Sequence, residues 1–247
     1  MTRRVVASAA ALLIGDELLS GKVRDQNLCA LATTLRGLGI ELRRVSIVRD
    51  EVEAIAHEVA ELSRSHDVVF TSGGVGPTHD DVTMQAVARA FGVATTLDPL
   101  MEHKLRDHYG ARCRDVHLRM ATVPEGATMA VPAEGAWPTV IMHNVWVLPG
   151  VPEIFRTKLA LVREQLCGPT PFFSRAVLTG LEEPELAPLL DRTVPQHSSV
   201  SIGSYPNWSA ARYRTKVTFD ARDPAAVQAA LDAFVALLPQ GEPVAIE

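Results

Sequence analysis

The sequence predicts an α/β fold, a mostly parallel sheet covered by helices, followed by a smaller α+β subdomain. Apolar, strand-like runs alternate with amphipathic, helix-like segments through the first part of the chain. The breaker-rich segment CGPTP at 167–171 interrupts this alternation. After it, the expected strands and helices follow the order of a split βαβ unit. We therefore expect a first domain over residues 1–168 and a subdomain over residues 172–247.

Hydrophobic spacing defines the first three strand–helix units. The run at 5–14 is continuously apolar, as expected for a strand buried on both faces, and leucines at helical spacing follow it. The same order then occurs twice more. The expected strand and helix pairs are 5–14 with 25–38, 42–48 with 52–62, and 67–71 with 81–91. Because a helix follows each strand, the strands are expected to be parallel.

The remaining elements are shorter. The first domain is expected to continue with a helix at 99–109, an irregular stretch, two strands around a turn at His143 and Asn144, and a helix at 152–166. In the subdomain we expect strands at 174–179, 199–203, 212–219 and 244–246, with helices at 184–193 and 224–238.

Composition narrows the functional classes. The chain has 247 residues, is 47% hydrophobic and 21% charged, and can therefore bury a sizeable core. Its net charge of −5 argues against a nucleic-acid-binding protein, which usually carries a basic surface. The three cysteines form no C-x-x-C pair, so neither a disulfide framework nor a zinc site is indicated.

The N-terminal apolar run has two possible interpretations. Two arginines precede it, as in a signal peptide. However, Gly15, Asp16 and Glu17 follow it where a small-residue cleavage site would be needed, and the run is too short to span a membrane. We therefore interpret it as a buried strand and expect a cytoplasmic protein that does not bind a membrane.

Acidic residues and glycines follow the expected strands. Ligands of open parallel sheets bind beyond the carboxyl ends of the strands, where these residues would meet. They are Asp16 and Glu17 after the first strand, Asp50 after the second, and Gly73, Gly74, Gly76, Asp80 and Asp81 after the third, in the segment TSGGVGPTHDDVT at 71–83.

This segment combines opposing electrostatic features. Backbone N–H groups of a glycine loop bind anions, whereas adjacent carboxylates repel them. A divalent cation between a phosphate and the carboxylates would reconcile the two, since Mg²⁺ takes carboxylates, waters and substrate phosphates together. Gly74 is expected to approach the ligand so closely that Gly74→Val abolishes binding and leaves the fold intact.

Structural alternatives remain for several of these residues. Asp80, Asp81 or Thr78 could cap the helix that is expected to begin there. His79 could contact a phosphate, move a proton or be solvated. In the subdomain, Arg212, Arg214 and Lys216 alternate on an expected strand beside the aromatic loop GSYPNW, and this basic face could meet a ligand phosphate or water.

Several segments resemble a known family. IGDELLSGKVRDQN, TSGGVGPTHDDVT and VLPGVPEIF are similar, in order and spacing, to the molybdopterin-binding (MoaB/Mog) domain. The most similar branches are the N-terminal domain of competence/damage-inducible protein A (CinA) and the equivalent domain of eukaryotic FAD synthase. SIGSYPNW and the strand RYRTKVTFD resemble the subdomain that follows this FAD synthase domain.

The resemblance implies a three-layer αβα domain with a mostly parallel sheet, plus the small C-terminal α+β subdomain. Mog-type members bind molybdopterin or transfer an adenylyl group to it with Mg²⁺, whereas the CinA and FAD synthase branches hydrolyse the pyrophosphate of ADP-ribose or FAD. It implies Mg²⁺, Mn²⁺ or Co²⁺ as cofactor, K⁺ as a further candidate, a nucleotide or pterin as ligand, and a homo-oligomer.

The resemblance also assigns roles by motif position. Asp50 and Asp81 would be the catalytic, metal-binding residues. The residues expected to bind substrate or phosphate are Gly15, Asp16, Glu17, Asn27, Gly73, Gly74, Gly76, Thr78, His79, Pro149 and Gly150.

The departures from the family pattern favour one activity. We expect neither the deamidase domain of many CinA proteins nor the flavin-adenylylating domain of FAD synthase in this chain. Val75 stands where Mog-type loops often carry threonine, so one hydroxyl contact is missing. The first hypothesis is therefore metal-dependent hydrolysis of a nucleotide pyrophosphate. The alternatives are molybdopterin binding or adenylyl transfer, and a non-enzymatic nucleotide-binding module.

Overall fold

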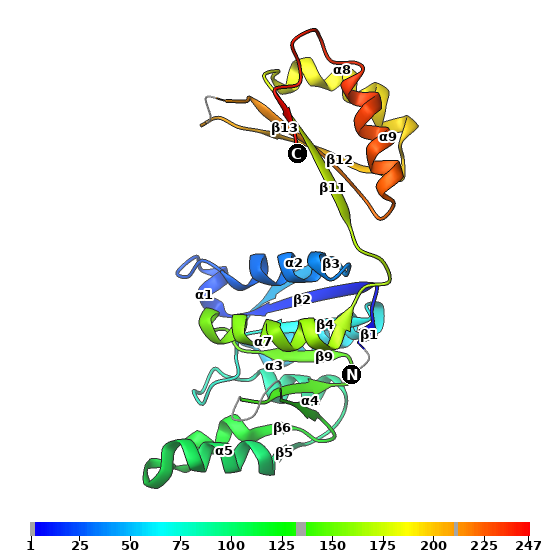
Figure 1. The fold of residues 1–247 in the computed structure, drawn as a ribbon. Helices are drawn as coiled ribbons and strands as arrows, with labels where there is room; N and C mark the ends of the chain where they lie inside the picture. The colour runs from blue at the N-terminus through cyan, green and yellow to red at the C-terminus, as the bar shows by residue number, and fades with distance from the viewer. Residues whose placement is uncertain (1–2, 132–136, 210–211) are drawn as a thin grey trace. The chain divides into compact units, whose positions relative to one another are not determined.

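The computed structural model describes residues 3–131, 137–209 and 212–247. The chain forms two compact units, Met1–Pro169 and Thr170–Glu247, which can be followed by colour in Figure 1. The division falls within the breaker-rich segment 167–171.

The first unit is organised around a six-stranded sheet in the order β3-β2-β4-β9-β8-β7. Strands β3, β2, β4 and β9 run parallel to one another, and β8 and β7 extend the sheet beyond β9 with antiparallel pairing. Their bounds are Ser8–Ile14 for β2, Glu41–Val48 for β3, Val68–Ser72 for β4, Thr128–Ala130 for β7, Thr139–Met142 for β8 and Val145–Leu148 for β9.

Helices cover both faces of this sheet, which confirms the three-layer αβα architecture. Helices α2 (Asn27–Gly37) and α7 (Pro152–Gln165) share one hydrophobic cluster with Ala9 and Ala11 of β2. Helices α3 (Val52–Ser65) and α4 (Thr83–Ala90) share the other with Ala10 and Leu12. Successive residues of a strand point to opposite faces, so β2 is buried on both, as its continuous apolar run predicted.

Shorter elements complete the first unit. The segment expected to be irregular after residue 109 holds three short helices and strand β6, which pairs with β5 in a separate two-stranded sheet. These elements are β1 Arg4–Val5, α1 Asp16–Leu19, β5 Thr95–Leu97, α5 Pro99–Tyr109, η1 Gly110–Arg112, α6 Asp115–Leu118, η2 Arg119–Ala121, β6 Thr122–Pro124 and β10 Leu166–Cys167.

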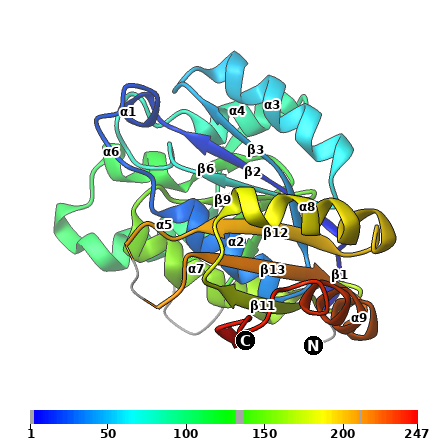
Figure 2. The ribbon, with the colours of Figure 1, turned by 90° about the horizontal axis from the view of Figure 1, so that it is seen from above.

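The second unit has a four-stranded antiparallel sheet in the order β12-β13-β11-β14. Strand β13 lies between β11 and β12, which makes those two parallel to each other and gives the expected split βαβ arrangement. Figure 2 shows these three strands side by side with α8 and α9. The elements are β11 Phe173–Thr179, α8 Glu183–Thr193, η3 Val194–Gln196, β12 Ser201–Pro206, β13 Thr215–Ala221, α9 Pro224–Val235 and β14 Ala245–Ile246.

The basic strand face expected in this unit does not form. Strand β13 begins at Thr215, so Arg212 and Arg214 precede it and do not share a face of it with Lys216. The inward side of β13 must bury Thr215, Val217, Phe219 and Ala221, whereas Lys216 pairs with Glu247, Nζ to Oε2, at 2.7 Å. No helix within the described residues is long and apolar enough to cross a membrane.

Candidate functional site

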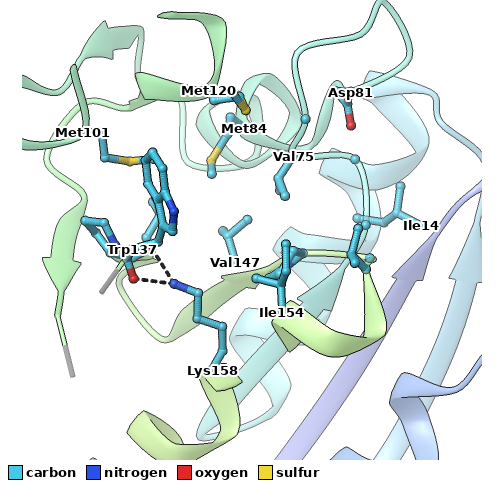
Figure 3. Close-up of a pocket in the computed structure, with 18 of the residues that line it drawn as sticks. Ile14, Val75, Asp81, Met84, Met101, Met120, Trp137, Val147, Ile154 and Lys158 are labelled. Atoms are coloured by element: carbon cyan, nitrogen blue, oxygen red, sulfur yellow. Dashed lines mark hydrogen bonds between the residues drawn. The ribbon is translucent and has the colours of Figure 1, made fainter. Parts of the chain in front are cut away.

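A cavity of about 630 Å³ lies in the first unit, beyond the carboxyl ends of β4 and β9. Figure 3 shows part of its lining. Of the residues expected at the site, the lining includes Glu17, Asp50, Gly73, Gly74, Gly76, Asp81, Pro149 and Gly150. It does not include Gly15, Asp16, Asn27, Thr78 or His79.

The glycine loop after β4 is held by its own packing. Gly73 and Gly74 have φ values of 114° and 64°, which favour glycine. A Cβ at Gly73 would meet the carbonyl oxygen of Ile14, and one at Gly74 would meet Oγ1 of Thr83. That hydroxyl donates to the Gly73 carbonyl at 2.9 Å. Contrary to the sequence-based expectation, Gly74→Val would therefore disturb the loop itself and is no clean test of ligand binding.

Asn27 joins this loop to the next one. The residue is 3% exposed, and its Nδ2 donates to Ser72 Oγ at 2.9 Å and to the Gly150 carbonyl at 2.8 Å. The Gly73 N–H also donates to the Leu148 carbonyl at 3.2 Å. Asn27 thus braces two loops of the cavity from behind and does not face the ligand space.

Asp81 is half-buried at the cavity and closes a tight turn. Its Oδ2 lies 2.8 Å from Thr78 N and 2.6 Å from Thr78 Oγ1, both of which can donate to it. Helix α4 begins two residues later, at Thr83, and its N-cap, Val82, makes no side-chain cap hydrogen bond. The alternative in which Thr78, Asp80 or Asp81 caps this helix is therefore wrong, because Asp81 supports the turn before it.

Asp50 lies close to other carboxylates at the same end of the cavity. Its Oδ2 accepts a hydrogen bond from the Asp16 N–H at 2.8 Å. Burial raises the pKa of Asp50, this hydrogen bond opposes the rise, and the charges of Glu17, Asp16 and Asp80 add to it. Carboxylates from three strand ends thus influence one another here. A cation would relieve their repulsion.

Several expected residues turn away from the cavity. Asp16 Oδ1 accepts from Arg49 Nε at 3.1 Å, and this hydrogen bond holds the pKa of Asp16 below its usual value. Gly15 lies beneath the Glu17 carboxylate, which would collide with a Cβ there. The His79 side chain is 96% exposed, which agrees with a solvated loop histidine.

The donor set suits a cation that arrives with a substrate. The described residues contain no group of three or more His, Cys, Asp or Glu side chains placed to hold one metal ion. Asp50 and Asp81 could supply two carboxylates, and ligand phosphates and waters would complete the coordination, as Mg²⁺ commonly requires. The cavity therefore fits a substrate-bound cation better than a resident metal enclosed by protein.

Sequence reasoning missed the opposite side of the cavity. It is lined by Met84, Met101, Met120, Trp137 and Lys158. Lys158 is 7% exposed, and burial lowers its pKa to about 8. The sequence held a signal for this residue. Lys158 lies on the same buried face of α7 as Phe155, Leu159 and Val162, so a lysine interrupts an apolar helical stripe.

Comparisons with known proteins cover both units. Residues 10–167 match the family described as the probable molybdopterin binding domain, and residues 171–247 match the middle domain of FAD synthase. A probable FAD synthase of Caenorhabditis elegans is 31% identical over 94% of this chain and 50% of its own length. A CinA-like protein of Desulfosudis oleivorans is 37% identical over 61% of this chain and 38% of its own length.

The chain spans about half the length of the FAD synthases that it matches. A protein of Pyrococcus horikoshii is of more similar extent, at 32% identity over 82% of this chain and 85% of its own length. Among solved structures, the crystal structure of the protein CinA from Thermoplasma acidophilum matches with a TM-score of 0.59 and 26% identity. The match covers 64% of this chain and 97% of that one.

Proposed function

We propose that this chain hydrolyses a nucleotide pyrophosphate with a divalent cation. The chain belongs to the probable molybdopterin binding domain family and is related to CinA-like proteins and FAD synthases. The observation that supports this most is the meeting of crowded carboxylates and a glycine loop at one end of a single cavity. Such a site suits a phosphate ligand that brings a cation with it.

The glycine loop supplies the phosphate-binding groups. The N–H of Gly73 is used within the fold, but those of Gly74, Val75 and Gly76 make no hydrogen bond to any described residue. All three residues line the cavity. Successive N–H groups without partners bind anionic oxygens, so this loop would hold one phosphate of the substrate.

The reaction would be a displacement at phosphorus. Water adds to one phosphorus of the pyrophosphate, and the bond from that phosphorus to the bridging oxygen breaks. The electron pair leaves with that oxygen, so two phosphate monoesters form. Asp50 and Asp81 would hold the cation, which polarises the phosphate and lowers the pKa of the attacking water. The carboxylates that line this end of the cavity are the bases for the proton released by water.

Two other functions are favoured by single observations. The match of residues 10–167 to the probable molybdopterin binding domain favours a pterin ligand, bound or adenylylated. The glycine loop, which can hold a phosphate without a metal, favours a binding module without turnover. The first predicts ATP-dependent adenylylation of molybdopterin, and the second predicts binding that no cation converts into product.

A substrate and metal panel tests the proposal. FAD, ADP-ribose, NAD and molybdopterin would each be incubated with Mg²⁺, Mn²⁺ or Co²⁺, with K⁺ present or absent, and the products separated by chromatography. We expect two monophosphates from at least one dinucleotide, and none in EDTA. Asp50→Asn should abolish turnover, whereas the adjacent control Glu51→Gln, which loses only an exposed ion pair with Arg49, should not. Turnover that survives EDTA would refute the proposal.

The expected homo-oligomer and cytoplasmic location remain predictions. Light scattering of the purified chain tests the first, and cell fractionation tests the second.

A further inference from the structure

The cavity has two chemically different sides. In Figure 3, Asp81 and Val75 lie on one side, Trp137 and Lys158 lie on the other, and Val147 lies between them. The proposed hydrolysis uses only the acidic side. The opposite side presents an aromatic ring, thioether side chains and a buried ammonium group.

Lys158 is held in an unusual setting for a lysine. Its Nζ donates to the backbone carbonyl of Trp137 and, at 2.9 Å, to that of Pro138. It forms no salt bridge with any described carboxylate. An ammonium group has three N–H donors, so two are used and one remains. Burying a cation without a counter-ion is costly, and Lys158 lines the cavity. A ligand atom that accepts a hydrogen bond would offset part of this cost.

Trp137 is anchored by its backbone, and its ring is left partly open. Trp137 is 37% exposed and lines the cavity. The rings of Trp137 and His108 make an edge contact, with their centroids 5.9 Å apart and an interplanar angle of 71°. His108 in turn makes an edge contact with Tyr109, at 4.8 Å and 89°. This row of rings orients Trp137 while leaving it able to stack on a flat ligand.

We propose that Trp137 and Lys158 form a ring-binding subsite, in which a fused heteroaromatic ring of the substrate stacks on Trp137 and accepts a hydrogen bond from Lys158 at a ring nitrogen. The subsite extends the proposed function, because it names the part of the dinucleotide that lies away from the pyrophosphate. Flavin and adenine rings both have this chemistry, and the experiment distinguishes them.

The first experiment uses ring fragments without a pyrophosphate. Riboflavin, adenosine and inorganic pyrophosphate with Mg²⁺ would be titrated into the full chain by calorimetry. Trp137→Ala should weaken binding of one ring fragment by about tenfold, as expected for the loss of one stacking contact between a base and an aromatic ring. Binding of pyrophosphate should change less than about twofold. Trp208→Ala in the second unit, a residue that is 91% exposed, is the matched control and should change neither.

The second experiment separates ligand recognition by Lys158 from its structural contacts. Lys158→Met also frees two carbonyls and could shift Trp137, which would weaken all ring ligands equally. If the chain binds adenosine, that ligand is therefore compared with its 1-, 3- and 7-deaza analogues. If the chain binds riboflavin, that ligand is compared with 5-deazariboflavin and 1-deazariboflavin. The wild-type chain should prefer the parent over one analogue by about fivefold, as for a single hydrogen bond. Lys158→Met should lose that preference.

The outcomes are separable from those of the hydrolysis proposal. Ring fragments that bind equally to wild type and Trp137→Ala, or do not bind at all, overturn the subsite even if the chain hydrolyses a dinucleotide. An analogue preference that persists in Lys158→Met overturns the role of the lysine. A subsite that behaves as expected in a chain without turnover overturns hydrolysis alone.

Discussion

The two sides of the cavity are assembled in different ways. The acidic side comes from loops that directly follow β2, β3 and β4, and one contiguous segment, 71–83, supplies its glycines and Asp81. The opposite side is drawn from α4, α5, η2, the segment before β8, and α7. A site whose residues lie close together in the sequence can be recognised from that sequence, whereas a site assembled by packing of distant segments cannot. Substitutions on both sides of the cavity test this contrast.

Asp81→Asn should produce the largest change in activity. The substitution preserves the shape of the side chain and removes a carboxylate that is proposed to hold the cation. With Mg²⁺, turnover should fall by roughly a thousandfold or more, since cation-assisted charge stabilisation contributes several kcal/mol. In EDTA, affinity for the phosphate ligand should hold or rise, by up to about tenfold, because a repulsive charge is gone. Steady-state kinetics and calorimetry measure the two effects, and wild-type turnover in the variant would exclude Asp81 from the metal site.

Gly73→Ala should cost the most stability. Gly73 has φ of 114°, and the added Cβ would meet the backbone carbonyl of Ile14, which cannot turn away as a side chain can. Backbone strain and overpacking together should lower the free energy of unfolding by about 3 kcal/mol. Denaturant unfolding measures it. Gly37→Ala, at a helical glycine with open space around its Cα, is the control and should be neutral or stabilising.

Asn27→Ala should weaken the brace between the two loops. The two hydrogen bonds from Nδ2 to Ser72 and Gly150 would be lost, and the buried hydroxyl of Ser72 would be left without this donor. The expected loss is about 2 kcal/mol in unfolding free energy. Thr71→Val is the matched control, since the Thr71 hydroxyl is buried without a hydrogen-bond partner among the described residues and its removal should cost nothing. Equal effects of the two substitutions would show that Asn27 is not a brace.

Lys158→Met should change how stability depends on pH. The folded-state pKa of Lys158, about 8, lies below the ordinary 10.5, so between these values the unfolded chain binds more protons. The wild type therefore carries the full cost of the buried charge below pH 8 and is relieved of it as the pH rises. From pH 7 to 9.5 the wild type should gain about 2 kcal/mol relative to the variant. Parallel unfolding curves at the two pH values test this, and an unchanged difference would contradict it.

Local patterns in the sequence determined much of the fold. The helix expected at 99–109 forms at those residues, because Pro99 follows Asp98, which accepts from the Met101 N–H, and Gly110 ends the helix. The continuous apolar run likewise indicated a strand buried on both faces. The resemblance inferred from the loop motifs is confirmed by the family matches.

Other features depended on contacts between residues distant in the chain. Helix α4 starts at Thr83 and not at Asp81, because Asp81 is engaged with Thr78 in the preceding turn. Strand β13 starts at Thr215, which is the first of its inward-facing residues to be buried in the core.

The layered fold and the acidic, glycine-rich side of the cavity could therefore be predicted from the sequence, since periodicity, turn residues and strand-end loops are local properties. Packing of the folded chain determines that Asn27 lies behind the loops, that Asp16 turns toward Arg49, and that Lys158 reaches the carbonyl of Trp137. A side chain's environment is set by whichever elements pack against it, and that packing is not encoded in its neighbours along the chain.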